Sequence, residues 1–151
     1  MSLVLVATAG EETDRDAIRE ALALLGQGHS YVFLAVYQAM PSGAMGAAGA
    51  MVPAPTLTRQ VWDDADKAGQ TAGHRQLQET VDALGRTGEI RVEEGDPAER
   101  ICAMATEDHV NLIVVGDHHH SMLSRLLRGS TSDDVAHHAP CPVLLARQRN
   151  L

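Results

Sequence analysis

The sequence has 151 residues, a formal net charge of −8 and only 3% aromatic residues. This length predicts a single domain over residues 1–151. The acidic balance argues against a surface for nucleic acid or anionic membranes, since both kinds of binding begin with clustered Lys and Arg.

The N-terminus and the cysteines predict a cytoplasmic protein. The opening run MSLVLVATAG has no basic lead, and it is too short for a membrane span or for a signal sequence with its cleavage site. Cys102 and Cys141 are the only cysteines. In a reducing compartment both are expected to be free thiols.

The first three elements are predicted to be a strand, a helix and a strand. Leu3–Thr8 is almost continuously apolar, as is typical of a strand buried on both faces of a parallel sheet. In Thr13–Leu25 the apolar residues recur at helical spacing, with Thr13 expected to cap the start and Gly26 to end the helix. Tyr31–Tyr37, rich in aromatic and branched residues, is the second strand.

The segment Ala39–Leu57 has neither helical nor strand periodicity. It is uncharged, rich in Gly, Ala and Pro, and contains three Met. Long connections of this kind are typical of lids, binding loops or disordered stretches. We predict a mobile lid in the free protein.

A long helix and an edge strand are expected next. Thr58–Leu84 predicts an amphipathic helix that Gly69 and Gly73 weaken. Glu89–Glu93 alternates strictly, which indicates an edge strand with its two apolar residues facing inward and its charged residues facing out. The apolar side of the helix is predicted to comprise Val61, Ala65, Ala68, Ala72, Val81 and Leu84.

The third predicted helix has a strong start signal. Asp96 is expected to be its N-cap, Pro97 its first-turn proline and Glu99 its capping-box acid. Cys102 lies on the inward face of this helix and is therefore predicted to be a small core residue rather than a reactive thiol. That face comprises Ala98, Ile101, Cys102 and Ala105.

The remaining segments complete an α/β pattern. Leu112–Gly116 is a fully apolar strand, Asp117–Arg128 a loop, Ser130–His138 a short helix and Val143–Ala146 a last apolar strand. This order of elements predicts a single open five-stranded parallel sheet with helices on both faces and right-handed crossovers.

A ligand site is expected at the carboxyl ends of the strands, where open α/β sheets bind their ligands. Gly129–Thr131 opens a helix whose unpaired N–H groups favour an anion. The simpler interpretation, in which Ser130 is only an N-cap and Gly129 a turn residue, stays open. The residues that follow or end the predicted strands are Thr8, Ala9, Gly10, Val36, Tyr37 and Gly116.

The C-terminal segment resembles the signature of the universal stress protein family. That signature runs glycine, two residues, glycine, nine residues, glycine, then Ser or Thr, and ends in His-Ala-Pro-Cys-Pro-Val. Gly116, Gly129, Ser130 and His138–Val143 match at these separations, and the opening LVLVATAG is similar to the family's start, so the resemblance covers essentially the whole chain. It implies a Rossmann-like fold of the adenine nucleotide hydrolase type, with strand order 3-2-1-4-5. It also implies a homodimer through the last strand, Val143, Leu144, Leu145 and Ala146.

In the branch of this family that binds ATP, the glycine loop and the following Ser or Thr hold the phosphates. The end of the second strand offers its backbone to adenine, and an acid after the first strand contacts the nucleoside. Two positions depart from that pattern, because the second glycine is His119 and the acid is Ala9. His119 places a side chain where backbone would approach phosphate, so the alternatives are a site for ATP or AMP, with accompanying Mg, and a disabled pocket. The resemblance assigns this site to Thr8, Ala9, Val36, Gly116, His119, Gly129, Ser130 and Thr131.

No metal site or self-contained catalytic site is expected. Consecutive residues of a loop, such as His118–His120, do not all face one ion, and CxxC and HExxH patterns are absent. A protonated His118 or His119 contacting phosphate is the alternative. The sequence also lacks the GxxxxGK, GxGxxG and GxSxG motifs, and Asp133 and Asp134 near Ser130 are ordinary first-turn acids of a helix.

Two functional hypotheses follow from these residues. The first is a regulatory homodimer of the stress response, with adenine nucleotide as its effector and an unidentified protein partner. The second is a nucleotide-independent interaction module with a disabled pocket, which uses the Met-bearing lid as an adaptable contact surface. Weak ATP hydrolysis is a third hypothesis, disfavoured because no general base is positioned for it.

Overall fold

The computed structural model describes residues 1–8, 12–37, 59–116 and 131–147. These residues contain a five-stranded, entirely parallel sheet in the order β3-β2-β1-β4-β5, which confirms the predicted fold and strand order. The predicted lid, Ala39–Leu57, lies outside the described residues. The strands are β1 (Ser2–Ala7), β2 (His29–Tyr37), β3 (Glu89–Glu94), β4 (Leu112–Gly116) and β5 (Val143–Ala146).

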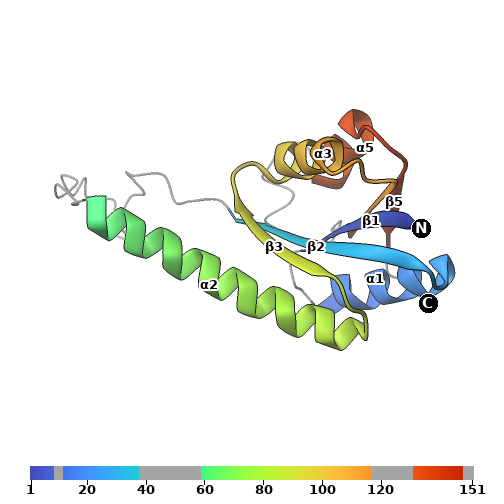
Figure 1. Cartoon of the computed structure of the whole chain (residues 1–151), viewed down its shortest axis with the longest axis horizontal. Coiled ribbons are helices and arrows are strands. Elements are labelled where there is room, and N and C mark those ends of the chain that lie inside the picture. The colour runs from blue at the N-terminus through green and yellow to red at the C-terminus, as the bar shows by residue number, and fades with distance from the viewer. Residues whose placement is uncertain (9–11, 38–58, 117–130, 148–151) are drawn as a thin grey trace.

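The helices form a layer on each face of the sheet (Figure 1). α1 (Glu12–Leu25) and α2 (Arg59–Leu84) cover one face, whereas α3 (Pro97–Glu107) and α5 (Thr131–His138) cover the other. Within the described part of the chain, no helix is long and apolar enough to cross a membrane.

Each face of the sheet has its own hydrophobic core, because successive side chains of a strand point to opposite faces. Val4 and Val6 of β1 face α1 and α2, while Leu5 and Ala7 face α3 and α5. All four are buried, so the continuous apolar run of β1 reflects burial on both sides. The first core includes the large buried side chains Tyr31, Phe33, Ile18, Leu22 and Leu77, and the second includes Leu5, Leu34, Met104, Ile113 and Ile101.

The predicted helix boundaries hold at α3 but not at the start of α1. The Asp96 side chain accepts a hydrogen bond from the backbone N–H of Glu99 at 3.0 Å, and Pro97 follows in the first turn, as predicted. Gly26 has φ of 76° directly after α1, which confirms it as the stop. The prediction that Thr13 is the N-cap of α1 was wrong, because the helix already begins at Glu12.

The predicted apolar side of α2 was wrong at Ala68 and Ala72, but Val81 and Leu84 are buried as predicted. Ala68 and Ala72 are exposed, and Gly69 and Gly73 face the sheet instead. A Cβ on Gly69 would lie 3.4 Å from the Tyr37 ring, and one on Gly73 would lie 2.9 Å from Val92. At Gly73 the helix therefore approaches Val92 of β3 too closely for a side chain, which explains this glycine in a helix despite its cost, whereas a Cβ at Gly69 would make an ordinary contact with the Tyr37 ring.

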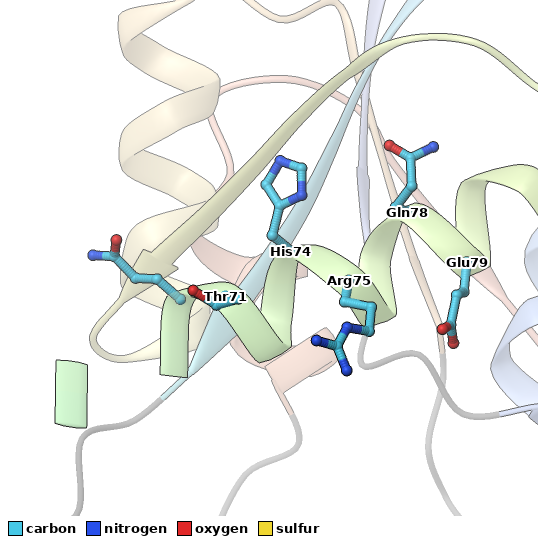
Figure 2. A pocket seen from close by; sticks show the side chains of 6 residues that line it. Thr71, His74, Arg75, Gln78 and Glu79 are labelled. Atoms are coloured by element: carbon cyan, nitrogen blue, oxygen red, sulfur yellow. The ribbon is translucent and has the colours of Figure 1, made fainter. Parts of the chain in front are cut away.

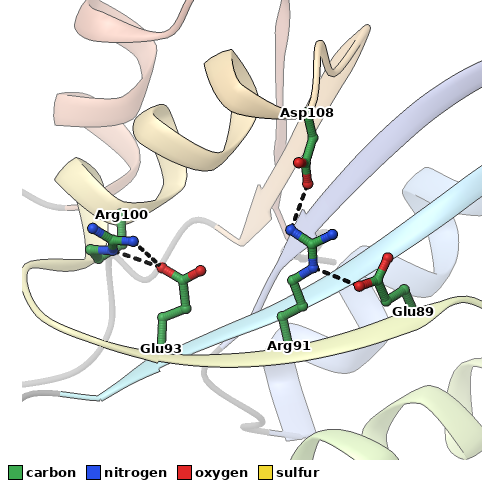
Figure 3. A network of polar contacts seen from close by, with 5 residues as sticks. All are labelled: Glu89, Arg91, Glu93, Arg100 and Asp108. Carbon is green, nitrogen blue, oxygen red and sulfur yellow. Dashed lines mark hydrogen bonds and ion pairs between the residues drawn. The ribbon is translucent and has the colours of Figure 1, made fainter.

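The edge strand β3 is tied to α3 by ion pairs (Figure 3). Ile90 and Val92 pack on the first core as predicted. The charged residues on the other side of β3 were predicted to face solvent, but Arg91 contacts Asp108 at 2.7 Å and Glu93 contacts Arg100 at 2.6 Å. Arg91 and Glu93 are partly buried as a result.

Two arginines join α1 and α2 near their C-terminal ends. Arg19 donates to the carbonyl of Ala83 at 3.2 Å, and Arg86 donates to the carbonyl of Leu22 at 3.1 Å. The Arg86 guanidinium also lies 5.8 Å from the centre of the Tyr31 ring. A carbonyl in the last turn of α2 thus accepts a hydrogen bond from an arginine of α1. A carbonyl in the last turn of α1 accepts one from an arginine in the turn after α2.

Candidate functional site

The sheet has a topological switch point between β1 and β4. From β1 the chain builds outward through β2 to β3, then returns to the other side of β1 as β4 and continues to β5. Ligands of open α/β sheets bind outside the carboxyl ends of the strands at such a point. Thr8 follows β1 directly and Gly116 ends β4, so both predicted site residues lie there.

A buried carboxylate lies at this point. The Thr8 hydroxyl donates to Oδ2 of Asp14 at 2.7 Å, and the two residues are only 7% and 4% exposed. The backbone N–H of Thr8 donates to the carbonyl of Leu34 at 3.1 Å, which fixes Thr8 against β2. Asp14 comes from the first turn of α1, where the positive end of the helix dipole favours a negative charge.

The carboxylate explains the glycine at the end of β4. A Cβ built on Gly116 would overlap the carboxylate of Asp14, because α1 packs against β4 and β5. The sequence predicted Gly116 as the start of a phosphate loop; the structure adds a packing reason for it. Thr8, Asp14 and Gly116, which we call the switch-point cluster, join β1, α1 and β4 into one unit.

The remaining predicted site residues are only partly described. The Val36 side chain packs on the core beneath α3 and α5, so it is directed into that core. Thr131 is the first residue of α5 and is partly exposed, and the next residue, Ser132, is buried. The other predicted residues, Ala9, Gly10, His118–His120, Gly129 and Ser130, lie outside the described residues.

Asp14 is the residue that the sequence predictions missed. It lies three and four positions before Ala17 and Ile18, at the start of the buried stripe of α1. An acid on the apolar stripe of a helix is a signal of a buried polar contact.

A groove elsewhere on the surface does not match the predicted site. It has a volume of about 540 Å³ and runs along the exposed side of α2. His74 and Gln78 extend to one side of the helix and Arg75 and Glu79 to the other (Figure 2). These side chains do not converge on one point as in a built ligand pocket, so we place the candidate site at the switch-point cluster.

The described residues contain no group of three or more His, Cys, Asp or Glu arranged to hold a metal ion. Asp14 is the acid of the switch-point cluster, and a single carboxylate suits Mg²⁺ only when the cation brings substrate phosphates and water as its other ligands.

Comparison with known proteins agrees with this fold. The model of the universal stress protein family matches residues 1–147. The chain belongs to the universal stress protein family. It is 34% identical over 92 residues to a universal stress protein of Synechocystis, a match that covers 59% of this chain and 85% of that one. A universal stress protein of Methanothermobacter thermautotrophicus is 44% identical over 54 residues, but this match spans only 36% of either chain.

Solved structures of universal stress proteins have the same fold. One, described in complex with cAMP, has a TM-score of 0.61 at 22% identity over 97% of this chain and 96% of that one. Another, from Arabidopsis thaliana with AMP bound, has a TM-score of 0.60 at 16% identity over 99% and 93% of the two chains. At these identities the likeness establishes the fold alone.

Proposed function

We propose that this universal stress protein is a regulatory homodimer of the stress response that binds an adenine nucleotide at the carboxyl edge between β1 and β4. The observation that carries the proposal is the buried Asp14 carboxylate at the topological switch point, held by Thr8 and abutting Gly116. Two proteins of the same fold have cAMP or AMP bound, which supports the ligand class. We do not assign the chain a catalytic residue.

The switch-point cluster supplies the carboxylate that is missing at position 9. Ala9 stands where the ATP-binding branch of the family has an acid, and Asp14 places a carboxylate beside the same strand end. A carboxylate only accepts hydrogen bonds, so it suits the hydroxyl or amino groups of a nucleoside rather than bare phosphate. The phosphates belong nearer to the N-terminus of α5, whose first residue is Thr131.

Calorimetric titration with ATP, AMP and cAMP tests the binding. The wild type is compared with Asp14→Asn, which keeps the shape and removes the charge, and with His74→Ala in the α2 groove as the control. We expect Asp14→Asn to weaken binding at least about tenfold, the loss of one hydrogen bond to a charged group, and the control to bind as the wild type does. No binding by the folded wild type, or equal affinities for all three proteins, would contradict the proposal.

His119 provides a second test of the same site. It falls on a glycine of the family signature, and a side chain there is expected to obstruct phosphate. Restoring glycine with His119→Gly should therefore raise the affinity for ATP more than for a nucleoside without phosphates. If the wild type already binds ATP as tightly as this variant, then His119 is itself a phosphate ligand.

The homodimer is proposed to form through β5. This strand pairs only with β4 in the described sheet, so its outer edge has backbone groups for a partner. Leu145, 37% exposed, is an apolar side chain on that edge. Leu144 packs on the first core, so its replacement would disturb the fold as well as a dimer.

Leu145→Lys is therefore the sharper test of the dimer. Leu24→Lys on α1 is a matched control, because Leu24 is also an exposed leucine. We expect the wild type and the control to have the mass of two chains in light scattering and Leu145→Lys to have the mass of one. A dimeric Leu145→Lys variant would place the interface elsewhere.

The second candidate function is an interaction module that binds no nucleotide. Ala9 and His119 favour it, because both depart from the ATP-binding pattern. Native mass spectrometry of the purified protein separates the two functions. A dimer that carries adenine nucleotide supports the regulatory protein, whereas a dimer that neither retains nor takes up nucleotide supports the interaction module.

A further inference from the structure

We propose that the ring of Tyr37 is the surface on which the base of the bound nucleotide stacks. The inference rests on the proposed nucleotide site and adds the residue that contacts the base. Tyr37 is the last residue of β2 and is partly exposed, whereas the other tyrosine, Tyr31, and the phenylalanine, Phe33, are buried in the first core. Among these three described rings, Tyr37 is the one within reach of a ligand.

β2 extends past the end of β1 on the side of the site (Figure 1). Ala7, the last residue of β1, pairs with Leu34, and the backbone N–H of Thr8 also donates to the Leu34 carbonyl. β2 continues beyond this pair to Tyr37, which still pairs with Glu94 of β3. This extension of the strand spans about 10 Å. Tyr37 therefore lies beside the space directly outside the carboxyl end of β1, where the nucleotide is proposed to bind.

The Tyr37 ring lies on the same face of the sheet as the Asp14 carboxylate. Side chains alternate along a strand, and Ala35 packs on the first core, so Tyr37 also points to the face of α1 and α2. Gly69 of α2 confirms this direction, because a Cβ built there would lie 3.4 Å from the ring. Asp14 belongs to α1 and abuts Gly116 at the end of β4. The carboxylate and the ring thus lie on two sides of the end of β1, the first toward β4 and the second over β2.

The ring is held in place from two directions. A side chain at Gly69 would contact it, so the ring packs beside the backbone of α2. The Tyr37 carbonyl accepts a hydrogen bond from the backbone N–H of Gly95 at 3.0 Å. A ring fixed in this way loses little further freedom when a ligand binds, and every base has a π-face that can stack on it. This arrangement gives the ribose hydroxyls to Asp14 and the base to Tyr37.

Fluorine NMR tests the contact directly, because the chain has only two tyrosines. The protein labelled with 3-fluorotyrosine should give two resonances, which Tyr31→Phe and Tyr37→Phe assign. We expect AMP to shift the Tyr37 resonance, because the ring current of a stacked base acts at short range. The Tyr31 resonance should stay in place, since Tyr31 lies about 20 Å away along β2. Ribose 5-phosphate, which has no base, should shift neither resonance.

Calorimetry with AMP measures what the ring contributes. We expect Tyr37→Leu to weaken AMP binding about tenfold, the loss of one base–aromatic stack, and Tyr37→Phe to bind within about twofold of the wild type. Tyr31→Leu is the matched control, because it removes a tyrosine from the same face of the same strand, far from the site. Its AMP affinity should equal that of the wild type. Circular dichroism establishes that each variant is folded.

The outcomes separate this inference from the proposed function. If the wild type binds no nucleotide, both are wrong. If AMP binds but the Tyr37 resonance does not move, or if Tyr37→Leu binds AMP as the wild type does, the nucleotide site stands and the base lies elsewhere. An equal loss of affinity in Tyr37→Leu and Tyr31→Leu would show that Tyr37 acts only through the stability of the sheet, and would also overturn the inference.

Discussion

The two ends of the sheet are held in different ways. At the amino end of β2, α1 and α2 are joined by Arg19 and Arg86, which donate to backbone carbonyls. At the carboxyl ends of β1 and β4, the contact is the buried pair of Thr8 and Asp14. The first arrangement uses partly exposed side chains, whereas the second encloses a carboxylate.

This difference separates stability from function. An exposed or half-exposed arginine contact costs little desolvation and contributes modestly. A buried carboxylate loses its hydration, and an apolar side chain of similar size would often stabilise a protein as well or better. Breaks in the pattern that favours stability are expected at functional sites. We therefore expect substitutions at the amino end to change stability alone, and substitutions at the carboxyl end to change both stability and the proposed nucleotide binding.

Gly116→Ala should have the largest effect. The added methyl group would overlap the Asp14 carboxylate, so either α1 or the end of β4 must move. We expect the free energy of unfolding, measured by urea denaturation, to fall by about 3 kcal/mol, the upper part of the range for overpacking.

The double variant Asp14→Ala with Gly116→Ala is the control for this overlap. Removal of the carboxylate makes room for the methyl group, so Gly116→Ala should cost about 1–2 kcal/mol less in the Asp14→Ala background than in the wild type. If the two substitutions are additive, the effect of Gly116→Ala arises from the backbone or another neighbour, and the cluster does not act as one unit.

Thr8→Val should have the next largest effect. It keeps the shape of the side chain but leaves the buried Asp14 carboxylate without the hydroxyl donor at 2.7 Å. A hydrogen bond to a charged group contributes about 1.5–3 kcal/mol, so we expect a loss of about 2 kcal/mol together with weaker nucleotide binding. A stability loss with unchanged nucleotide affinity would make the cluster purely structural.

The sequence predicted the sheet better than it predicted the site. Continuous apolar runs such as Leu112–Gly116 and the cap at Asp96 are local signals, so the strands and the start of α3 could be found without the fold. The face of α2 could not, because only the closeness of Val92 shows that Gly73 must lack a side chain. The role of Asp14 likewise could not be predicted, because its contacts with Thr8 and Gly116 form only when the ends of β1 and β4 lie beside α1.

Arg86→Met tests the amino end. The variant keeps an apolar stem but loses the hydrogen bond to the Leu22 carbonyl and the cation above the Tyr31 ring. We expect a loss of about 1 kcal/mol, typical of one net hydrogen bond, with nucleotide affinity unchanged. Arg75→Met on the exposed side of α2 is the control and should change stability by less than about 0.5 kcal/mol. An effect of Arg86→Met on nucleotide binding would show that the two ends of the sheet are energetically coupled.

The smallest effect is expected at Glu89, the first residue of β3, which accepts a hydrogen bond from Arg91 at 2.7 Å. That hydrogen bond lowers the pKa of Glu89 below its ordinary value of 4.5, against a weaker opposing effect of desolvation. The folded state therefore binds this proton less tightly than the unfolded state, so the contribution of Glu89 to stability is present above pH 4.5 and is lost as the pH falls through the lower folded-state pKa.

Glu89→Gln should thus be slightly less stable than the wild type at neutral pH, and the difference should shrink in acid. It should also shrink in high salt, because more than half of the Glu89 side chain is exposed and its charge is screened. Arg91 retains Asp108 as a partner in the variant, so the strand should stay attached to α3. A difference that persists unchanged in acid and in salt would show that Glu89 stabilises β3 by packing and not by its charge.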